Sequence, residues 1–196
     1  MLTPLGTRIH IYGNSCSGKS TLGERLAKSF GLRLVDLDSI NWLPGWVSLA
    51  ETDPERFCDR LNTETQDDGW VVAGSYTRFC QQTFWPRLKT IVWLDLPVPV
   101  LLWRVLKRSW RRWRTKELLW GTNHEQFWPH LKVWNRDSLI WWIVSQSRVK
   151  RETMIRTMAD PQFAHIRVVR VRSARELQLL CTELGVRGKD PGEHNR

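Results

Sequence analysis

A short segment near the start of the chain limits the possible folds more than any other part of it. The segment reads Gly13, Asn14, Ser15, Cys16, Ser17, Gly18, Lys19 and Ser20, and Thr21 follows. Residues 8–12, which precede it, have the apolar character of a short strand. Apolar residues then recur every four positions from Leu22 to Phe30, and Gly31 is suited to end a helix. The sequence therefore predicts a strand, a glycine loop and a helix in succession.

The spacing Gly-x-x-x-x-Gly-Lys-Ser is that of a phosphate-binding loop, or P-loop. Its glycines let backbone N–H groups point inward at a β-phosphate, and the N-terminus of the next helix adds positive potential. Lys19 is suited to contact the β- and γ-phosphates, and the Ser20 hydroxyl to ligate magnesium. Residues 13–21 therefore predict a site for a nucleoside triphosphate, namely ATP with Mg²⁺.

The rest of the chain alternates strands and helices. Strands are predicted at residues 8–12, 32–36, 70–74, 90–95 and 166–171, and helices at 19–30, 52–66, 97–113, 137–158 and 174–184. Such alternation predicts an α/β protein with a mainly parallel sheet. Residues 36–45 are expected to form a functional loop, and residues 115–130 to be irregular. We expect one domain over residues 1–184 and a disordered tail over residues 185–196.

Composition narrows the partners and the compartment. The net charge of +10 favours an anionic partner such as nucleotide phosphates or nucleic acid. The four scattered cysteines have no disulfide or zinc spacing, although Cys16 could be oxidised within the loop. No long apolar run predicts a membrane span, so we expect a cytoplasmic protein with no membrane partner. The oligomeric state does not follow from the sequence.

Two aspartates follow the second predicted strand. Asp36 and Asp38 are two residues apart, so on an extended segment both carboxylates point the same way. One could hold a magnesium-bound water, and the other could accept a proton from a substrate hydroxyl. The alternative is a pair of solvated turn residues.

The third predicted strand leads into a second candidate loop, on the acceptor side. It contains Gly74, Tyr76 and Arg78, and we expect these residues to face the group that receives the phosphate. Arg78 could bind an anionic group bidentately; the alternative is a surface arginine. Asp95, after the fourth strand, is interpreted as a helix cap rather than a magnesium ligand.

Residues 96–116 contain no acidic side chain. Arg104, Arg108 and Arg111 share one helical face there, with Trp103 and Trp110 interleaved. Three interpretations remain open. A lid could close its arginines over the transferring phosphoryl group. The segment could instead bind nucleic acid through phosphate contacts and tryptophan stacking. It could also be a solvated face over a tryptophan core.

Taken together, these segments resemble the P-loop kinase superfamily around adenylate, shikimate and gluconate kinases. Within it, the chain is most similar to the adenylate kinase-related proteins called DNA topology modulation proteins, from about residue 8 to residue 184. The segments that carry the resemblance are residues 13–20, 35–38, 70–76, 91–95, 102–105 and 171–176. The resemblance implies a three-layer sandwich around a five-stranded parallel sheet of the nucleoside monophosphate kinase type, with a helical lid at roughly residues 108–136.

The resemblance also implies roles for individual residues. Arg104 matches an arginine that packs on adenine, and Arg108 matches a lid arginine that reaches phosphate. Arg172 and Ser173 match a loop that borders the base. The pair Asp36 and Asp38 resembles the magnesium and acceptor aspartates of shikimate kinases.

One departure concerns Ala73, because related proteins often carry aspartate there; the magnesium role would shift to Asp36 or Asp38. We therefore expect a phosphotransferase that moves the ATP γ-phosphoryl group to a small acceptor, with catalysis assigned to Lys19, Asp36, Asp38 and Arg108. The alternative is a nucleotide-dependent nucleic-acid-binding or regulatory protein with weak ATPase activity.

Overall fold

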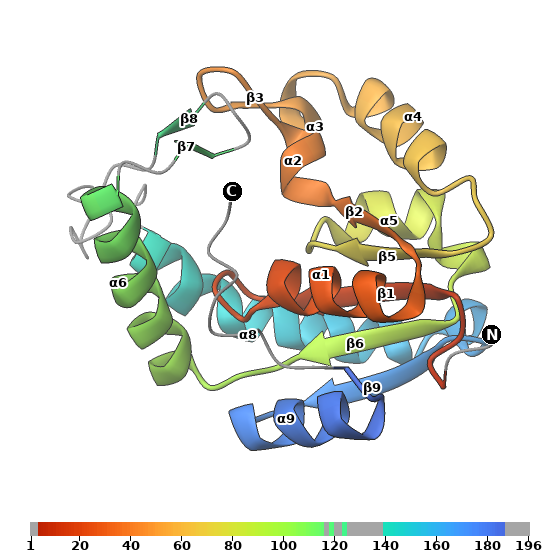
Figure 1. Ribbon diagram of the computed structural model, residues 1–196. Coiled ribbons are helices and arrows are strands. Elements are labelled where there is room, and N and C mark those ends of the chain that lie inside the picture. The colour runs from red at the N-terminus through yellow and green to blue at the C-terminus, as the bar shows by residue number, and fades with distance from the viewer. Residues whose placement is uncertain (1–3, 116–117, 120–122, 125–138, 187–196) are drawn as a thin grey trace.

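The fold is built on a five-stranded parallel sheet (Figure 1). A computed structural model describes residues 4–115, 118–119, 123–124 and 139–186. The strands lie in the order β2-β5-β1-β6-β9 and span Arg33–Asp36, Trp70–Ala73, Arg8–Gly13, Thr90–Leu94 and Arg167–Val171. Every neighbouring pair in this sheet is parallel. The predicted α/β class is confirmed.

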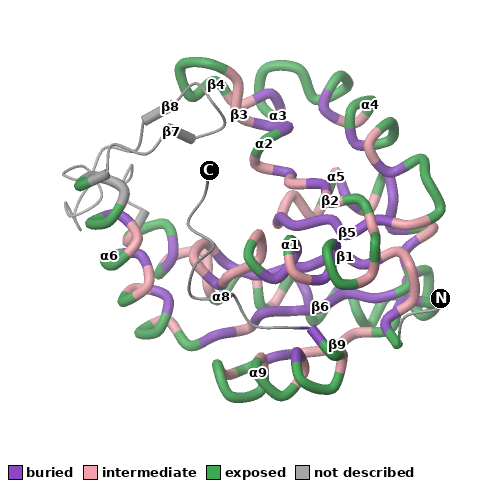
Figure 2. Tube along the Cα trace, in the orientation of Figure 1, coloured by how far each residue is buried: buried purple, intermediate pink, exposed green. Residues whose placement is uncertain are grey.

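Helices cover both faces of the sheet. Helices α1 (Lys19–Phe30) and α9 (Ala174–Glu183) lie on one face, and α4 (Pro54–Glu64), α5 (Thr77–Thr83) and α8 (Leu139–Met158) lie on the other. Strand β1 divides its side chains accordingly. Ile9 and Ile11 pack into the core beneath α1, whereas Tyr12 packs into the core beneath α8. Because helices cover both faces, every residue of β5 and β6 is buried (Figure 2).

The predicted loop at residues 36–45 is wrong in part. It contains the short helix α2 (Leu37–Asn41) and the strand β3 (Trp42–Leu43), which pairs with β4 (Val47–Ser48). The Asp36 side chain starts α2 by accepting a hydrogen bond from the backbone N–H of Asp38. Helix α3 (Leu49–Thr52) follows the hairpin. A helix cap and a tight turn follow each other closely here, so α2, β3 and β4 are too short to be predicted from an apolar period.

The remaining elements lie outside the central sheet. They are η1 (Trp85–Arg87), α6 (Val98–Thr115), β7 (Leu118–Leu119), β8 (Asn123–His124) and η2 (Pro161–Phe163). Within the predicted lid, residues 108–115 continue α6, and β7 pairs with β8. Much of the rest of that segment lies outside the described residues.

The packed part of the chain extends past the predicted domain end. Val186 is buried in the core beneath α9, whereas residues 187–196 of the predicted tail lie outside the described residues. None of the described helices combines the length and the apolar character needed to cross a lipid bilayer.

Candidate functional site

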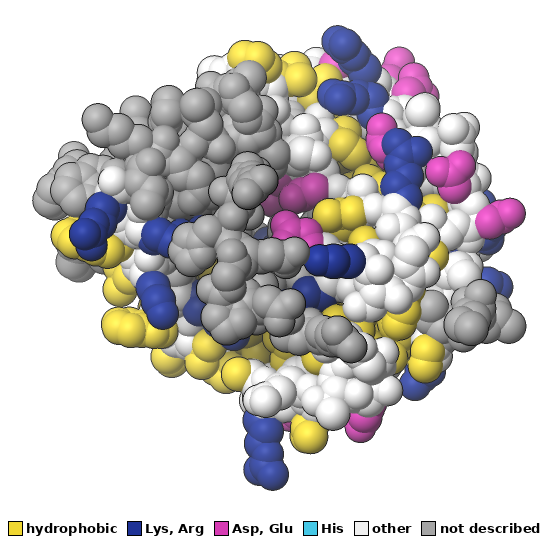
Figure 3. All heavy atoms as spheres, viewed as in Figure 1, with side chains coloured by type: hydrophobic (Ala, Val, Ile, Leu, Met, Phe, Trp, Pro, Cys, Tyr) yellow, Lys and Arg dark blue, Asp and Glu magenta, His cyan; other side chains and the backbone are white. Residues whose placement is uncertain are grey.

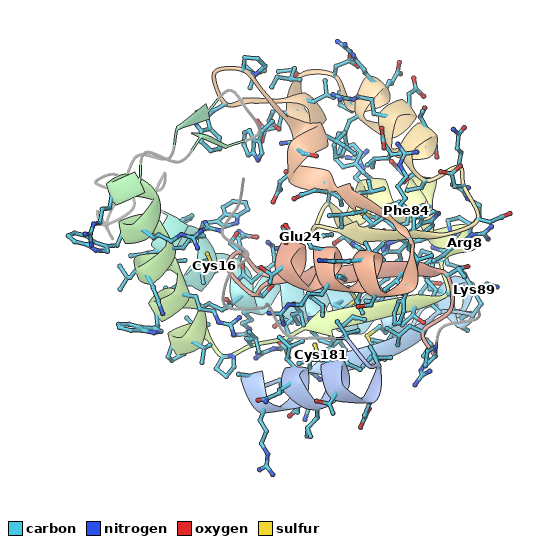
Figure 4. All side chains as sticks on the ribbon, viewed as in Figure 1. Arg8, Cys16, Glu24, Phe84, Lys89 and Cys181 are labelled. Carbon is cyan, nitrogen blue, oxygen red and sulfur yellow. The ribbon has the colours of Figure 1, made fainter. Side chains whose placement is uncertain are left out.

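The P-loop joins the carboxyl end of β1 to the start of α1. Backbone packing there requires glycine at residue 13, because a Cβ would lie 2.7 Å from the carbonyl oxygen of Leu94. Gly18 has a φ of 100° and Cys16 a φ of 59°, both in the left-handed region. Cys16 lies beside the α6–α8 pair and packs against its small apolar core (Figure 4). The loop conformation is therefore fixed by its neighbours.

Asn14 fastens this loop to α8. Its Nδ2 donates hydrogen bonds to Ser147 Oγ at 2.8 Å and to the Ile143 carbonyl at 3.1 Å. Its Oδ1 accepts a hydrogen bond from the Ser15 N–H at 2.8 Å. The sequence assigns Asn14 to nucleotide binding, but the side chain is committed to holding the loop. The predicted contact of Asn14 with the nucleotide stays a prediction.

Lys19 and Ser20 present the chemistry expected of the loop. Lys19 Nζ donates a hydrogen bond to the Asn14 carbonyl at 3.0 Å. Burial lowers the pKa of Lys19, while the nearby carboxylate of Asp38 opposes that shift. Ser20 Oγ donates to Asp36 Oδ2 at 3.3 Å. The lysine is therefore held inside a partly buried site that also contains carboxylates.

The same pair of oxygens fits a magnesium ion. Among the described residues, no group of three or more histidine, cysteine or acidic side chains could form a metal cage. Mg²⁺ commonly binds through one or two carboxylates, waters and substrate phosphates instead. Ser20 and Asp36 supply such donors. Ala73 pairs with Asp36 on the adjacent strand, so a carboxylate lies one strand away from the position where the family resemblance implies an aspartate.

Asp36 and Asp38 lie close together, but the extended geometry predicted for them is wrong. Asp36 ends β2, whereas Asp38 belongs to the first turn of α2. Burial and then the charge of Asp38 raise the pKa of Asp36. Asp38 Oδ1 accepts a hydrogen bond from the Tyr76 hydroxyl at 3.0 Å. A helix cap and a tyrosine therefore bring the two carboxylates to the site.

The predicted acceptor loop divides into a central part and a peripheral part. A Cβ on Gly74 would lie 2.5 Å from Leu37 Cβ, so glycine allows α2 to approach β5. Tyr76 reaches Asp38, and its ring packs against Phe57 with centroids 5.3 Å apart. Arg78 is exposed on α5. Burial and then the charge of Asp59 raise the pKa of Cys58, and the charge of Arg78 opposes that rise. No contact among the described residues brings Arg78 to Asp38.

His10 supports the acceptor loop from beneath. Trp85 Nε1–H donates to His10 Nδ1 at 3.1 Å, so His10 Nε2 carries the proton and donates to the Gly74 carbonyl at 3.2 Å. The imidazole is fully buried. Burial lowers its pKa to about 3, and it stays neutral near physiological pH. Sequence reasoning missed this residue because its partners lie far along the chain.

Two arginines of α6, Arg104 and Arg108, lie at or beside the P-loop. Arg104 Nη1 donates to the Ser17 carbonyl at 2.8 Å, so it contacts the loop backbone. Arg108 is half-buried, and its charge contributes to the lowered pKa of Lys19. Trp103 and Trp110 instead point outward, with 68% and 53% of their surfaces exposed. The basic tryptophan-rich segment therefore has two faces.

Arg172 and Ser173 form the start of α9. Ser173 Oγ accepts a hydrogen bond from the Glu176 N–H at 3.1 Å, and Glu176 Oε2 accepts one from the Arg172 N–H at 2.7 Å. The pattern resembles a capping box, except that Glu176 bonds to the residue before the N-cap Ser173 and not to Ser173 itself. The predicted contact with the base stays a prediction, and the groups described here serve the helix.

Lys150 joins the site without a sequence signal strong enough to identify it. It lies on α8 and lines a small hollow with Tyr12, Gly13 and Asn14. Burial and then the charge of Lys19 lower its pKa to about 8, and Asp38 opposes that shift. A second cation is thus present near the phosphate loop.

Asp95 does not cap α6, which begins three residues later at Val98. Its carboxylate accepts hydrogen bonds from Arg151 of α8 at 2.9 Å and from Arg170 of β9 at 2.5 Å. The Arg170 guanidinium also lies 4.2 Å from the centre of the Trp93 ring. This network fastens α8 to the edge of the sheet.

Comparisons with known proteins agree with this architecture. No family model matches the chain. The uncharacterized protein YqaC of Bacillus subtilis (strain 168) is 29% identical over 118 residues, which cover 60% of this chain. The matched residues span 65% of that relative's length.

Solved structures of P-loop kinases share the fold. A gluconokinase from Sinorhizobium meliloti 1021 has a TM-score of 0.50 at 18% identity, covering 94% of this chain and 92% of its own. A sugar kinase from Janibacter sp. HTCC2649 has a TM-score of 0.51 at 14% identity, covering 92% and 95%. A shikimate kinase from Bacteroides thetaiotaomicron has a TM-score of 0.50 at 19% identity, covering 91% and 98%. The chain therefore has a P-loop kinase fold.

Proposed function

We propose that this protein is an ATP-dependent phosphotransferase that moves the γ-phosphoryl group to a hydroxyl of a small acceptor. The observation that carries the proposal is the contact between the P-loop and the acidic pair, where Ser20 Oγ donates to Asp36 Oδ2 at 3.3 Å and the Asp38 N–H donates to Asp36 Oδ1 at 3.0 Å. Burial lowers the pKa of the P-loop residue Lys19, and the nearby charge of Asp38 opposes that shift. The lysine belongs to the half that would hold the donor. Asp38 belongs to the half that would hold the acceptor of the phosphoryl group.

The donor half is suited to ATP with magnesium. The loop and the N-terminus of α1 favour bound phosphates, and Lys19, Arg104 and Arg108 are cationic groups at or beside it. Magnesium, held by Ser20 and Asp36, would neutralise charge on the phosphate oxygens. Lys19 and Arg108 would stabilise the charge that spreads over the transferring group.

The acceptor half favours a hydroxyl over a phosphate. A hydroxyl must lose its proton during transfer, and Asp38 is a carboxylate suited to accept it. An acceptor phosphate is already anionic and would be repelled by Asp36 and Asp38. Arg78, assigned from sequence to bind an anionic acceptor, is exposed and lies near Cys58 of α4. Tyr76 would hold Asp38 in place through its hydrogen bond at 3.0 Å.

Closer membership rests on sequence motifs alone. Residues 35–38 and 70–76 support membership of the adenylate kinase-related DNA topology modulation proteins. We also propose that the protein acts in the cytoplasm. The gluconokinase and shikimate kinase named above support a small hydroxylated acceptor instead of a nucleotide. We therefore propose that the protein is a P-loop kinase. The identity of its acceptor will distinguish between the closer groups.

The test is a screen for phosphate transfer. The protein is incubated with ATP and Mg²⁺ and with separate panels of hydroxylated metabolites and nucleoside monophosphates, and products are identified by mass spectrometry. We expect one hydroxylated compound to gain a phosphoryl group while ADP forms. ATP hydrolysis with every acceptor silent would refute the transfer reaction. Transfer to nucleoside monophosphates alone would refute the hydroxyl preference.

A further inference from the structure

Helix α6 carries a large apolar and basic surface that the phosphotransferase proposal does not use. Its outer face consists of Pro99, Val100, Trp103, Leu106, Lys107, Trp110, Arg111 and Arg114, all exposed. Trp103 is 68% exposed and Trp110 is 53% exposed. Contiguous exposed apolar surface of this kind marks an interaction site. We call these eight residues the α6 outer face.

The two faces of α6 have separate tasks. Leu101 and Val105 are buried against Ile143 of α8, and Arg104 contacts the P-loop carbonyl of Ser17. The opposite side points away from the body of the protein, where Figure 3 shows Lys and Arg side chains among hydrophobic ones on the left of the view. The outer face can therefore be covered by a partner without displacing the nucleotide-binding groups.

The geometry of the outer face is that of an interfacial helix. Trp103 and Trp110 are seven residues apart, so they follow one line along the helix, roughly 10 Å apart. Val100 and Leu106 lie beside that line. Lys107, Arg111 and Arg114 recur at spacings of four and three, which places their charges along one flank. Apolar rings thus form the centre of the face, with a row of cations next to them.

We propose that the α6 outer face docks the protein on the surface of an anionic phospholipid bilayer. Residues 96–116 contain no acidic side chain, so the face complements negative charge. Tryptophan rings suit the headgroup level of a bilayer, and lysine and arginine contact lipid phosphates. The helix would lie in the plane of the surface. Such contact needs no membrane-spanning segment, so it is compatible with the absence of spanning helices among the described residues.

The composition of the face favours lipid over the other anionic partners. Val100 and Leu106 gain free energy by leaving water for a bilayer, but aliphatic side chains do not stack on bases as tryptophans do. Single-stranded nucleic acid is usually held in a charged groove, whereas this face is the outside of one helix. A second copy of the chain would bring the same positive charges together.

The test is sedimentation of the full chain with two kinds of vesicle. One kind is phosphatidylcholine alone, and the other is equal parts of phosphatidylcholine and phosphatidylserine. We expect binding to the anionic vesicles to be about tenfold tighter or more, and to weaken with added salt. The double variant Trp103→Ala/Trp110→Ala should weaken it by about tenfold or more. Lys107→Gln/Arg111→Gln should remove much of its dependence on phosphatidylserine.

Trp46→Ala provides the matched control. Trp46 is 41% exposed in the β3–β4 hairpin, away from α6, so this variant should bind vesicles like the wild type. Circular dichroism and thermal unfolding identify any variant that fails to fold, and Trp103→Gln/Trp110→Gln replaces one that does. Absence of vesicle binding by the wild type would overturn the proposal. So would equal losses in Trp46→Ala, or tighter binding of an oligonucleotide that the α6 variants abolish.

Discussion

The two halves of the candidate site differ in how the chain builds them. On the donor side, Lys19 and Ser20 are neighbours on one short loop, and the phosphate-binding groups follow each other along the chain. On the acceptor side, Asp38 comes from α2, Tyr76 from the segment after β5, and His10 from β1. The phosphate loop at the centre of the donor half is local, with further cations added by α6 and α8, whereas the acceptor half is assembled from distant segments. A change in one half should therefore leave the other largely intact.

The halves also differ in charge. Lys19, Arg104, Arg108 and Lys150 make the donor side positive, whereas Asp38 makes the acceptor side negative. This polarity matches a reaction in which an anionic group moves toward a base. Substitutions that separate binding of ATP from transfer of its phosphate test whether the two halves are independent.

Lys19→Ala should have the largest effect. Loss of the cation between the phosphates should weaken ATP binding and lower turnover by about 10³-fold. Calorimetry and ADP formation measure the two quantities. Lys28→Ala, an exposed lysine later in the same helix, should behave like the wild type. Unchanged ATP affinity and turnover in Lys19→Ala would contradict the donor assignment.

Asp38→Asn should damage only the acceptor half. Without a carboxylate to accept the proton, transfer should fall by about 10²-fold, while the affinity for ATP changes little. Asp59→Asn, on the exposed side of α4, is the control. A parallel loss of ATP affinity in Asp38→Asn would mean that the two halves are not independent.

Lowering the pH should destabilise the folded protein through His10, which lies beneath the acceptor loop. The pKa of His10 is lowered to about 3 in the folded protein from 6.5, so the unfolded chain takes up the proton first. Stability is therefore full above pH 6.5 and is lost as pH falls from there toward 3, by about 2 kcal/mol at about pH 5. Denaturant unfolding at several pH values measures this loss.

Histidine variants identify the group responsible. The raised pKa of Asp36 acts in the opposite direction, so each variant is compared with the wild type at every pH. His10→Gln should reduce the loss of stability as the pH falls below 6.5. Replacing the exposed His165 by glutamine should leave that loss unchanged. If the wild type and His10→Gln lose the same stability as the pH falls, His10 is not the group responsible.

Tyr76→Phe should have a smaller effect, confined to transfer. It removes one hydrogen bond to a carboxylate, which should lower transfer by about tenfold with ATP affinity unchanged. Tyr12→Phe is the control, since the Tyr12 hydroxyl donates to the Lys150 carbonyl at 3.4 Å and shares a hydrogen bond with Thr77 rather than with a carboxylate. Full transfer activity in Tyr76→Phe would show that Asp38 needs no support.

Ser173→Ala should have the smallest effect. Loss of the cap should lower the free energy of unfolding by about 1 kcal/mol, and Ser173→Asp should restore it. If Ser173 serves only α9, ATP affinity will not change in either variant. Weaker ATP binding in Ser173→Ala would support the base contact that the sequence predicts.

The predicted fold is confirmed, whereas the roles assigned to the site residues stay predictions. The helix at residues 19–30 was predicted with its observed ends, and Gly31 stops it with a φ of 64°. The apolar runs of β5 and β6 predict these central strands, because both strands are buried on both faces. The short helix α2 was missed because its five residues span little more than one turn, too few to establish a period. Asp36 and Asp38 were selected on an extended geometry that the structure does not have.

The sequence by itself determined the phosphate loop, its place between a strand and a helix, and the parallel sheet, because spacing along the chain encodes all three. Only the tertiary structure decided how Asn14 and the α6 arginines are used, and which groups surround Asp38. Tyr76 bonds to a residue 38 positions away, and Asn14 to one 133 positions away. Contacts over such distances depend on how helices pack on the sheet, which local periodicity does not specify.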